Sequence, residues 1–282
     1  MSPLRQQMIA DMQLRGLAPR TQKAYLAVVE QLAGYYHQSP AYLTQNQIHC
    51  YLLHLIEERK LAWSSTNQAA CALRFLYHTT LHQPDTYCCI PARKTAAKLP
   101  EILSPDEVAR LLDACLLLKH RALLMTTYAA GLRVSETCAL KVDDIDSERM
   151  MLRIEGGKGG RDRYSLLSPL LLATLRQYWR AERPRHWLFA KGNGSGPIDV
   201  SHARKAFYRA KQRAGIHKEG GIHSLRHAFA THLLEAGVDI HTIGRLMGHD
   251  KITTTARYLH LRQQQAKTNS PLDLLSALKN RQ

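Results

Sequence analysis

The segment His223-Ser224-Leu225-Arg226-His227 is followed further along the chain by Gly248-His249-Asp250-Lys251-Ile252-Thr253-Thr254-Thr255-Ala256-Arg257-Tyr258. These two segments bring imidazoles, a guanidinium and a phenol into one short stretch. A phenol can attack phosphorus when cations stabilise the phenolate, and guanidinium groups can hold phosphate oxygens in pairs. Together the two segments favour chemistry on a phosphodiester.

The chain that carries these segments is strongly basic. It has 282 residues and a formal net charge of +16, from 39 Lys and Arg against 23 Asp and Glu. The length predicts two domains, and the charge predicts a nucleic acid as partner. Residues 1–98 carry ten Lys and Arg against five Asp and Glu, so the basic character extends over both halves. This distribution favours a protein that wraps its partner over one with a basic tail.

The cysteines and the apolar segments predict the compartment. The six cysteines form no Cys-x-x-Cys pair and match no zinc-binding spacing, so we expect buried free thiols in a reducing cytosol. No apolar signal segment follows Met1, and no apolar run approaches the ~18 residues that span a bilayer. We therefore expect a soluble, cytoplasmic protein without membrane contact.

Helical periodicity dominates the first part of the chain. Apolar residues recur at helical spacing over residues 21–36, 48–58 and 64–78. Pro19 suits the start of the first of these helices, and the hydroxyl residues at 64–66 offer N-caps for the last. A small helical bundle is the simplest way to bury the three apolar faces, so we expect a helical domain over residues 1–88.

A change of composition separates this domain from the rest. Prolines and few large apolar residues occur up to residue 100, and residues 89–100 include Arg93 and Lys94. This composition predicts an exposed basic linker that could contact a polyanion. An ordinary surface loop is the alternative.

The second part, residues 101–282, predicts helices around one small sheet. Ser104 and Glu107 predict a capping box at a helix start, and Pro105 fits the first helical position. The expected helices cover residues 105–114, 121–130, 169–182, 201–214, 224–236 and 239–247. Strands over 150–155 and 163–167 flank a glycine-rich hairpin turn. The predicted fold class is therefore mainly α with a small antiparallel β-sheet.

Candidate functional residues lie at the ends of these elements. His223 and Arg226 are three positions apart at a helix start, where free N–H groups favour a phosphate. Arg133 follows a glycine that ends a helix, and Glu136 could orient its guanidinium. Taken alone, these pairs also fit a helix cap with a surface arginine and an ordinary helix-end ion pair.

Three further candidates have equally simple alternatives. Lys158 is flanked by glycines and could reach a partner and deliver a proton, or it could occupy a plain turn. His249 could donate to a phosphate oxygen or cap a helix. Tyr258 could be a nucleophile, although a tyrosine chosen at random is more often part of a core.

Residues 201–213 form a strongly basic helix. Its cations include Arg204, Lys205 and Arg209, which could follow a phosphate backbone or enter a groove. A solvated helix face is the alternative.

In this combination the chain resembles the tyrosine recombinase (phage integrase) family. The matching stretches are residues 131–136, the Lys158 hairpin, 223–227, 246–249 and 253–258. The resemblance is specific over about 100–262 and looser over the first part, through 21–25 and the helical pattern. It implies an N-terminal core-binding bundle that clamps DNA, followed by a catalytic domain over 101–282.

The resemblance also implies the chemistry and the role of each residue. Tyr258 would attack the scissile phosphate, leaving a 3′-phosphotyrosyl link and a free 5′-hydroxyl. Arg133 and Arg226 would neutralise the non-bridging oxygens, and Lys158 would be the general acid. His223 would assist proton transfer and His249, a position where some members carry Trp, would hydrogen-bond the phosphate. The family's reaction needs no metal or other cofactor.

Family members exchange strands as tetramers on two double-stranded DNA sites, so the resemblance implies a homotetramer, with accessory proteins as a further possibility. The final segment, 271–282, has leucines at every third position from Leu272 to Leu278 and a proline at its start. We expect it to dock on a neighbouring protomer; packing on its own domain is the alternative.

Two other functions remain open at this point. A type IB topoisomerase shares the chemistry in outline, and a non-catalytic DNA-binding regulator shares the basic charge. The separate N-terminal bundle and the two histidines at 223 and 249 favour the recombinase. The length fits a Xer-like or a mobile-element-borne enzyme, acting in integration, excision or resolution.

Overall fold

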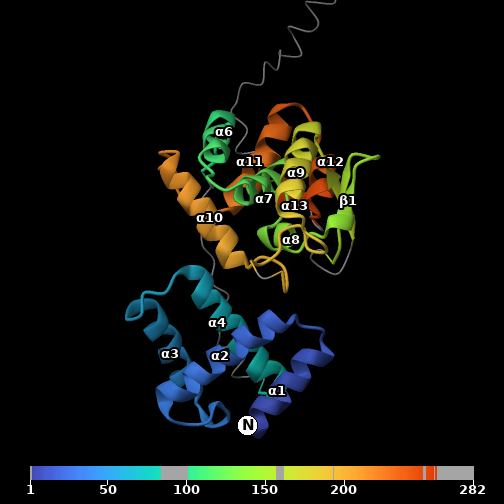
Figure 1. Cartoon of the computed structure of the whole chain (residues 1–282). Coiled ribbons are helices and arrows are strands. Elements are labelled where there is room, and N and C mark those ends of the chain that lie inside the picture. Colours follow the sequence, from blue (N-terminus) through green and yellow to red (C-terminus); the bar gives the residue numbers. More distant parts are fainter. Residues whose placement is uncertain are drawn as a thin grey trace, which may run out of the picture. The chain divides into compact units, whose positions relative to one another are not determined.

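The computed structural model describes residues 2–83, 101–156, 162–192, 194–249, 252–256 and 258. The chain divides into two compact units, Met1–Ala97 and Lys98–Gln282, which are considered separately (Figure 1). Lys158, Arg93, Lys94 and the segment 271–282 lie outside the described residues.

The first unit is a bundle of helices. Its elements are α1 (Pro3–Leu14), α2 (Pro19–Tyr36), the 3-10 turn η1 (Pro40–Tyr42), α3 (Gln45–Glu57), α4 (Trp63–Phe75) and the π-helical turn η2 (Leu76–Thr80). Their apolar faces meet in one core, whose fully buried members include Met12, Leu32, Ile48, Leu73 and Tyr77. The three helices that the periodicity predicts are all present, and Pro19 is the first residue of α2.

Two features of this unit differ from expectation. Helix α1 was not predicted; it begins at Pro3, and the Ser2 side chain accepts from the Arg5 amide. The hydroxyl residues at 64–66 are not N-caps, because α4 begins earlier and Ala62 occupies the cap position. The Thr66 hydroxyl instead donates to the Ala62 carbonyl, at 3.4 Å.

The second unit surrounds a small sheet with helices. The helices are α6 (Pro105–Asp113), α7 (Leu118–Ala129), α8 (Val134–Cys138), α9 (Pro169–Glu182), α10 (Val200–Arg213), α11 (His223–Glu235), α12 (Ile240–Met247) and α13 (Ile252–Ala256), with the 3-10 turn η3 (Val142–Asp144). The predicted capping box is present: the Ser104 amide donates to Glu107 Oε2 and the Glu107 amide donates to Ser104 Oγ. The expected fold class, mainly α with a small antiparallel sheet, is confirmed.

The sheet has the order β1-β2-β3, from Ile145–Asp146, Met151–Ile154 and Arg163–Leu166, with both pairs antiparallel. Alternation along β2 buries Leu152 and Ile154, as predicted. Strand β1 was not predicted, because two residues are too short to show a period. On β3 the buried Ser165 hydroxyl donates to the Ala130 carbonyl at 2.7 Å, which ties the sheet to the end of α7.

Four cysteines lie among the described residues, and none of them forms a disulfide. Cys138 is buried as expected, and burial raises its pKa to about 12. Cys50 is exposed, so the expectation that the thiols are buried is wrong there. It lies on α3, whose other face carries the core residues.

Gly131 connects α7 to α8 at a point where only glycine fits. Its φ is +60°, and a Cβ built on it would overlap the ring of Phe229 on α11. The next residues, Leu132 and Val134, are buried in the core of the unit. The backbone turn at Gly131 therefore fixes where Arg133 leaves the core.

We expect Gly131→Ala to lower the free energy of unfolding of the second unit by about 2 to 3 kcal/mol, through backbone strain and overpacking. Gly192→Ala is the control, because its Cβ would meet nothing within 4 Å. Denaturant unfolding followed by circular dichroism measures both. Equal stability of the two variants would contradict this account of Gly131.

Candidate active site

The site begins at the start of α8, where Arg133 is the N-cap residue. Its amide donates to Glu136 Oε2 at 2.8 Å, and its Nη1 donates to Glu136 Oε1 at 2.6 Å. Its Nη2 donates to the Gly248 carbonyl at 3.2 Å. The arginine therefore joins α8 to the end of α12, while 24% of its side chain stays exposed.

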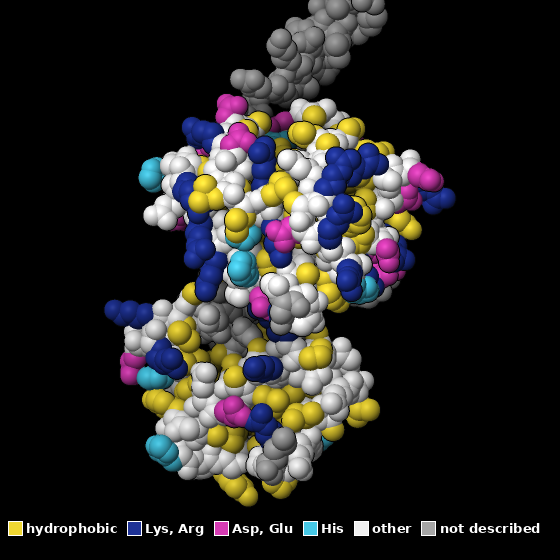
Figure 2. All heavy atoms as spheres, in the orientation of Figure 1, with side chains coloured by type: hydrophobic (Ala, Val, Ile, Leu, Met, Phe, Trp, Pro, Cys, Tyr) yellow, Lys and Arg dark blue, Asp and Glu magenta, His cyan; other side chains and the backbone are white. Residues whose placement is uncertain are grey.

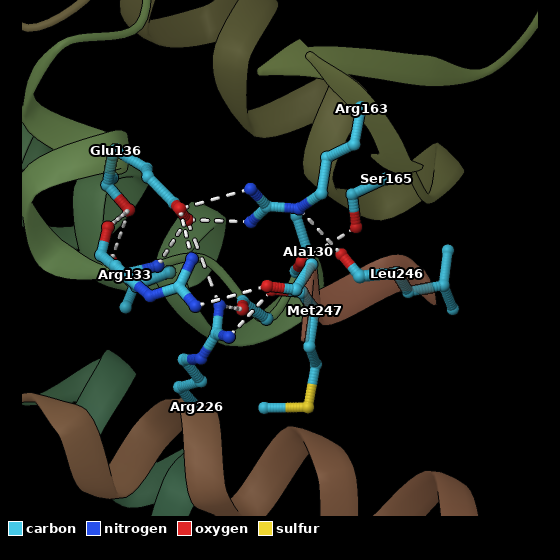
Figure 3. Close-up of polar contacts among 12 residues, drawn as sticks. Ala130, Arg133, Glu136, Arg163, Ser165, Arg226, Leu246 and Met247 are labelled. Atoms are coloured by element: carbon cyan, nitrogen blue, oxygen red, sulfur yellow. Dashed lines mark hydrogen bonds and ion pairs between the residues drawn. The ribbon is translucent and has the colours of Figure 1, made fainter. Parts of the chain in front are cut away.

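A second arginine, Arg163 on β3, shares the same carboxylate (Figure 3). Its Nη1 and Nη2 donate to Glu136 Oε1 and Oε2 at 3.0 and 2.7 Å. Its Nε donates to the Leu246 carbonyl at 3.1 Å. Arg163 was not among the residues predicted from the sequence, although a signal exists. It is two positions before Ser165, so a charged residue lies on the inward face of a short strand.

Glu136 is the centre of these contacts. Burial alone would raise the pKa of its carboxyl, but the hydrogen bond from Arg163 and those from the Arg133 amide and side chain lower this pKa to about 2. Its side chain is only 8% exposed. The carboxylate is thus ionised at neutral pH and holds two guanidinium groups in fixed positions.

Arg226, on the first turn of α11, is buried at 5% exposure. Its Nη1 donates to the Gly131 carbonyl at 2.6 Å and its Nη2 to the Met247 carbonyl at 2.7 Å. Burial and the nearby Arg133 lower the pKa of Arg226 to about 10, so the guanidinium stays charged at neutral pH. A buried cation held by neutral carbonyls can attract an anion.

His249 lies next to Arg226. The Arg226 Nη2 is 3.1 Å from His249 Nε2, and His249 Nδ1 is 2.8 Å from Thr255 Oγ1. A guanidinium can only donate, so Nε2 accepts and Nδ1 carries the hydrogen that is donated to Thr255. For Nε2 to donate to a phosphate oxygen, His249 must carry a hydrogen on Nε2, either as the other neutral tautomer, with Nδ1 accepting from the Thr255 hydroxyl, or as the protonated ring.

Tyr258 is buried, with 3% of its surface exposed. It packs in a small apolar cluster that includes Phe229, Leu234 and Met247. Its hydroxyl is 2.9 Å from Nδ1 of His227 on α11. His227 lies within the 223–227 motif, but no role was predicted for it from the sequence.

His223 begins α11 and its side chain is exposed. Desolvation, followed by the charges of Arg204, Arg226 and Arg133, lowers its pKa. Three arginines that the sequence predicted as functional residues therefore lower the pKa of His223. A lowered pKa favours the neutral form, which can accept a proton.

The candidate DNA-binding residues of α10 do not all lie on one edge of the helix. Arg204 lowers the pKa of His223, whereas Arg209 is among the cations that, after burial and His202, lower the pKa of His120 on α7. Five positions correspond to about 140° around a helix axis. Arg204, Lys205 and Arg209 are all exposed, but only Arg204 is placed beside the site.

Across the described ranges, no group of three or more His, Cys, Asp or Glu residues is placed to hold a metal ion. In the same ranges no helix has both the length and the apolar character needed to cross a bilayer. The site is instead built from three arginines around one carboxylate, and this surplus of positive charge can bind a phosphate.

Comparisons with known proteins place both units in one family. The phage integrase family matches residues 101–265, and the N-terminal SAM-like domain of phage integrases matches residues 4–85. The chain is 46% identical over 277 residues to the putative integrase/recombinase y4qK of Sinorhizobium fredii, covering 98% of this chain and 90% of that protein. It is 33% identical over 222 residues to tyrosine recombinase XerD of Corynebacterium glutamicum, covering 72% of each.

Solved structures show the same fold. A lambda integrase tetramer bound to a Holliday junction aligns with a TM-score of 0.73 at 18% identity, covering 95% of this chain and 79% of that one.

We expect the ionised Glu136 to stabilise the second unit in a pH-dependent way. Its folded pKa of about 2 lies below the reference value of 4.5, so the stabilisation, on the order of 3 kcal/mol, is present above pH 4.5 and is lost as pH falls towards 2. The difference in free energy of unfolding between the native protein and Glu136→Gln should therefore shrink through this window, as measured by denaturant unfolding at a series of pH values.

Glu155→Gln is the control, since Glu155 is an exposed carboxylate that also contacts two cations, Lys141 and Arg153. Water screens such pairs, so this variant should resemble the native protein throughout. A Glu136→Gln difference that stays constant as the solution is acidified would contradict the assignment.

Proposed function

This chain belongs to the phage integrase family, and from that premise we propose that Tyr258 is the nucleophile with which it breaks and rejoins DNA strands. The protein is a site-specific recombinase of the tyrosine type. The observation that carries the assignment is the convergence of Arg133, Arg226 and His249 at the end of α12, a few residues before Tyr258.

The proposed reaction is a transesterification. The Tyr258 oxygen forms a bond to the scissile phosphorus, and the bond from phosphorus to the 5′-oxygen breaks. The phenolic proton leaves with the help of the neutral His223, and Lys158 gives a proton to the departing 5′-oxygen. A 5′-hydroxyl of another strand then reverses these steps, so the energy of the phosphodiester is conserved.

Charge neutralisation falls to the arginines. The two non-bridging oxygens already share one negative charge, and a second develops during attack. Preorganised cations are most effective where water is excluded. Arg226 is buried and fixed by two carbonyls, and Arg133 is fixed by Glu136. In our proposal these two guanidinium groups hold the phosphate, and His249 with a hydrogen on Nε2 adds a third donor.

The buried phenol must move before it can attack. Its hydroxyl lies against His227 and its ring is packed against apolar side chains. We therefore propose that DNA binding shifts the segment from α13 to Tyr258 and exchanges His227 for the scissile phosphate.

We propose that the partner is double-stranded DNA and that the exposed side of α10 that carries Arg204 is part of the binding surface. Figure 2 shows Lys and Arg side chains following the exposed edge of α10 in the second unit. Arg204 joins this surface to the site through its position beside His223. Arg93, Lys94 and Lys205 remain candidates for further backbone contacts.

The assembly is also a proposal. The lambda integrase in the related structure is a tetramer on a Holliday junction. Exchange of four strands requires four nucleophiles, so we propose a homotetramer on paired sites, with segment 271–282 docking on a neighbour. Because the enzyme acts on DNA, we propose that it is located in the cytoplasm. The proposal also allows for accessory proteins in the assembly. A type IB topoisomerase and a DNA-binding regulator have no support among the relatives.

Tyr258→Phe should abolish covalent protein–DNA adducts and keep DNA binding, because the phenol oxygen is the only atom removed. A pool of randomised duplexes carrying a nick is incubated with each protein, and adducts are detected after denaturing electrophoresis. The control is Tyr128→Phe, since Tyr128 is a half-buried tyrosine whose hydroxyl also contacts a histidine, His232. Absence of an adduct with the native protein would refute the proposed function.

Arg204→Ala should weaken DNA binding and reduce the slope of log K against log salt by about one, the loss of one phosphate contact. Arg209→Ala, on the other edge of α10, should leave this slope unchanged. Fluorescence anisotropy with the duplex recovered in the adduct experiment, at several salt concentrations, measures both variants. Equal slopes for the two variants would place the DNA elsewhere.

A further inference from the structure

We propose that Arg163 is a positioning residue, which fixes Arg133, Arg226 and His249 relative to one another without touching DNA. This inference rests on the proposed function, because it concerns how the phosphate-binding groups are held. Arg163 is 11% exposed, and each of its three guanidinium nitrogens donates to an acceptor inside the protein (Figure 3).

The Glu136 carboxylate has a limited capacity for hydrogen bonds. A carboxylate offers about four acceptor positions. Oε1 accepts from Nη1 of Arg133 and Nη1 of Arg163, and Oε2 accepts from the Arg133 amide and Nη2 of Arg163. Arg163 therefore occupies half of the carboxylate.

This occupancy determines what Arg226 does. Its Nη1 lies 3.8 Å from Glu136 Oε2, an ion pair beyond hydrogen-bond length. The donors of Arg226 go instead to the Gly131 and Met247 carbonyls. Without Arg163, two acceptor positions on Glu136 would open, and the closest cation to fill them would be Arg226. That shift would draw Arg226 away from the phosphate.

Arg163 also contacts the end of α12. Three consecutive carbonyls there, those of Leu246, Met247 and Gly248, accept from Arg163, Arg226 and Arg133 respectively. The last carbonyls of a helix lack partners within the helix and carry partial negative charge, so cations bind them well. The three arginines form one clamp on the residues that precede His249.

Gly248 shows how closely Arg163 fits this clamp. Gly248 has a φ of +64°, and a Cβ there would lie 2.8 Å from Arg163 Cδ. The arginine therefore packs on the backbone of the turn that presents His249. It connects β3, α8 and α12, and removing it would loosen all three at once.

The test uses Arg163→Gln, with Arg153→Gln as the control. Arg153 lies on the neighbouring strand β2 and contacts two carboxylates, Asp144 and Glu155, outside the site. The probe is a nicked duplex of the sequence recovered in adducts of the native protein. We measure the single-turnover rate of adduct formation, the affinity for the duplex and thermal stability.

Arg163→Gln should form the adduct about 100-fold more slowly at unchanged duplex affinity, as expected for a displacement of about 1 Å at a reacting centre. Arg153→Gln should react at the native rate. A second duplex carries a methylphosphonate at the scissile position, which removes one negative charge. Because fixed arginines matter less there, the defect of Arg163→Gln should fall below about tenfold.

A defect of equal size on both duplexes would indicate a general structural role and overturn the proposal, as would a native rate on both. If the Arg163→Gln protein fails to fold, Arg163→Lys takes its place in the test. Lysine keeps the charge but cannot contact Glu136 twice and Leu246 together. A native rate for Arg163→Lys would show that charge alone matters and would also overturn the proposal. If the native protein formed no adduct at all, the proposed function itself would be refuted.

Discussion

The buried carboxylate of Glu136 is the interaction on which the rest of the site depends. Arginines 133, 163 and 226 lie within ion-pair distance of it, and no two of them could be held so close without a negative charge between them. The carboxylate does not neutralise the cluster completely. A surplus of positive charge remains at the edge where Arg133 is exposed, so the same arrangement that stabilises the fold also attracts an anion.

The scaffold explains why this cluster can form. Arg133 enters it from the turn at Gly131, Arg226 from the start of α11 and Arg163 from a strand whose inward face is otherwise small or apolar. None of these elements is long, and each is tied to another by a carbonyl or a hydroxyl, such as Ser165 to Ala130. Short elements joined in this way form a rigid frame for side chains that must keep their positions while a strand is cut.

Local features of the sequence predicted most of the fold. The capping box at Ser104, the alternation around Leu152 and the glycine that ends α7 are each visible within a few residues. The motifs also predicted that Arg133, Arg226 and Tyr258 belong to one site, and the structure brings Arg133 and Arg226 together at the end of α12. The contacts of Arg163 could not be predicted, because they join β3 to α8 and to α12 across long separations. The contact between His227 and Tyr258 was missed for the same reason, since only folding brings α11 against Tyr258. Helix α1 was missed because its apolar face is narrow.

The contacts of the three arginines with the end of α12 limit where residues can be inserted into or deleted from this protein. A helix turns about 100° and rises about 1.5 Å for each residue, so one inserted or deleted codon between 240 and 248 would turn the three carbonyls away from their arginines. The turn before Asp239 lies outside the segment that the three arginines contact. Length variation, and an inserted peptide tag, should therefore be tolerated better in the turn just before Asp239 than within α12.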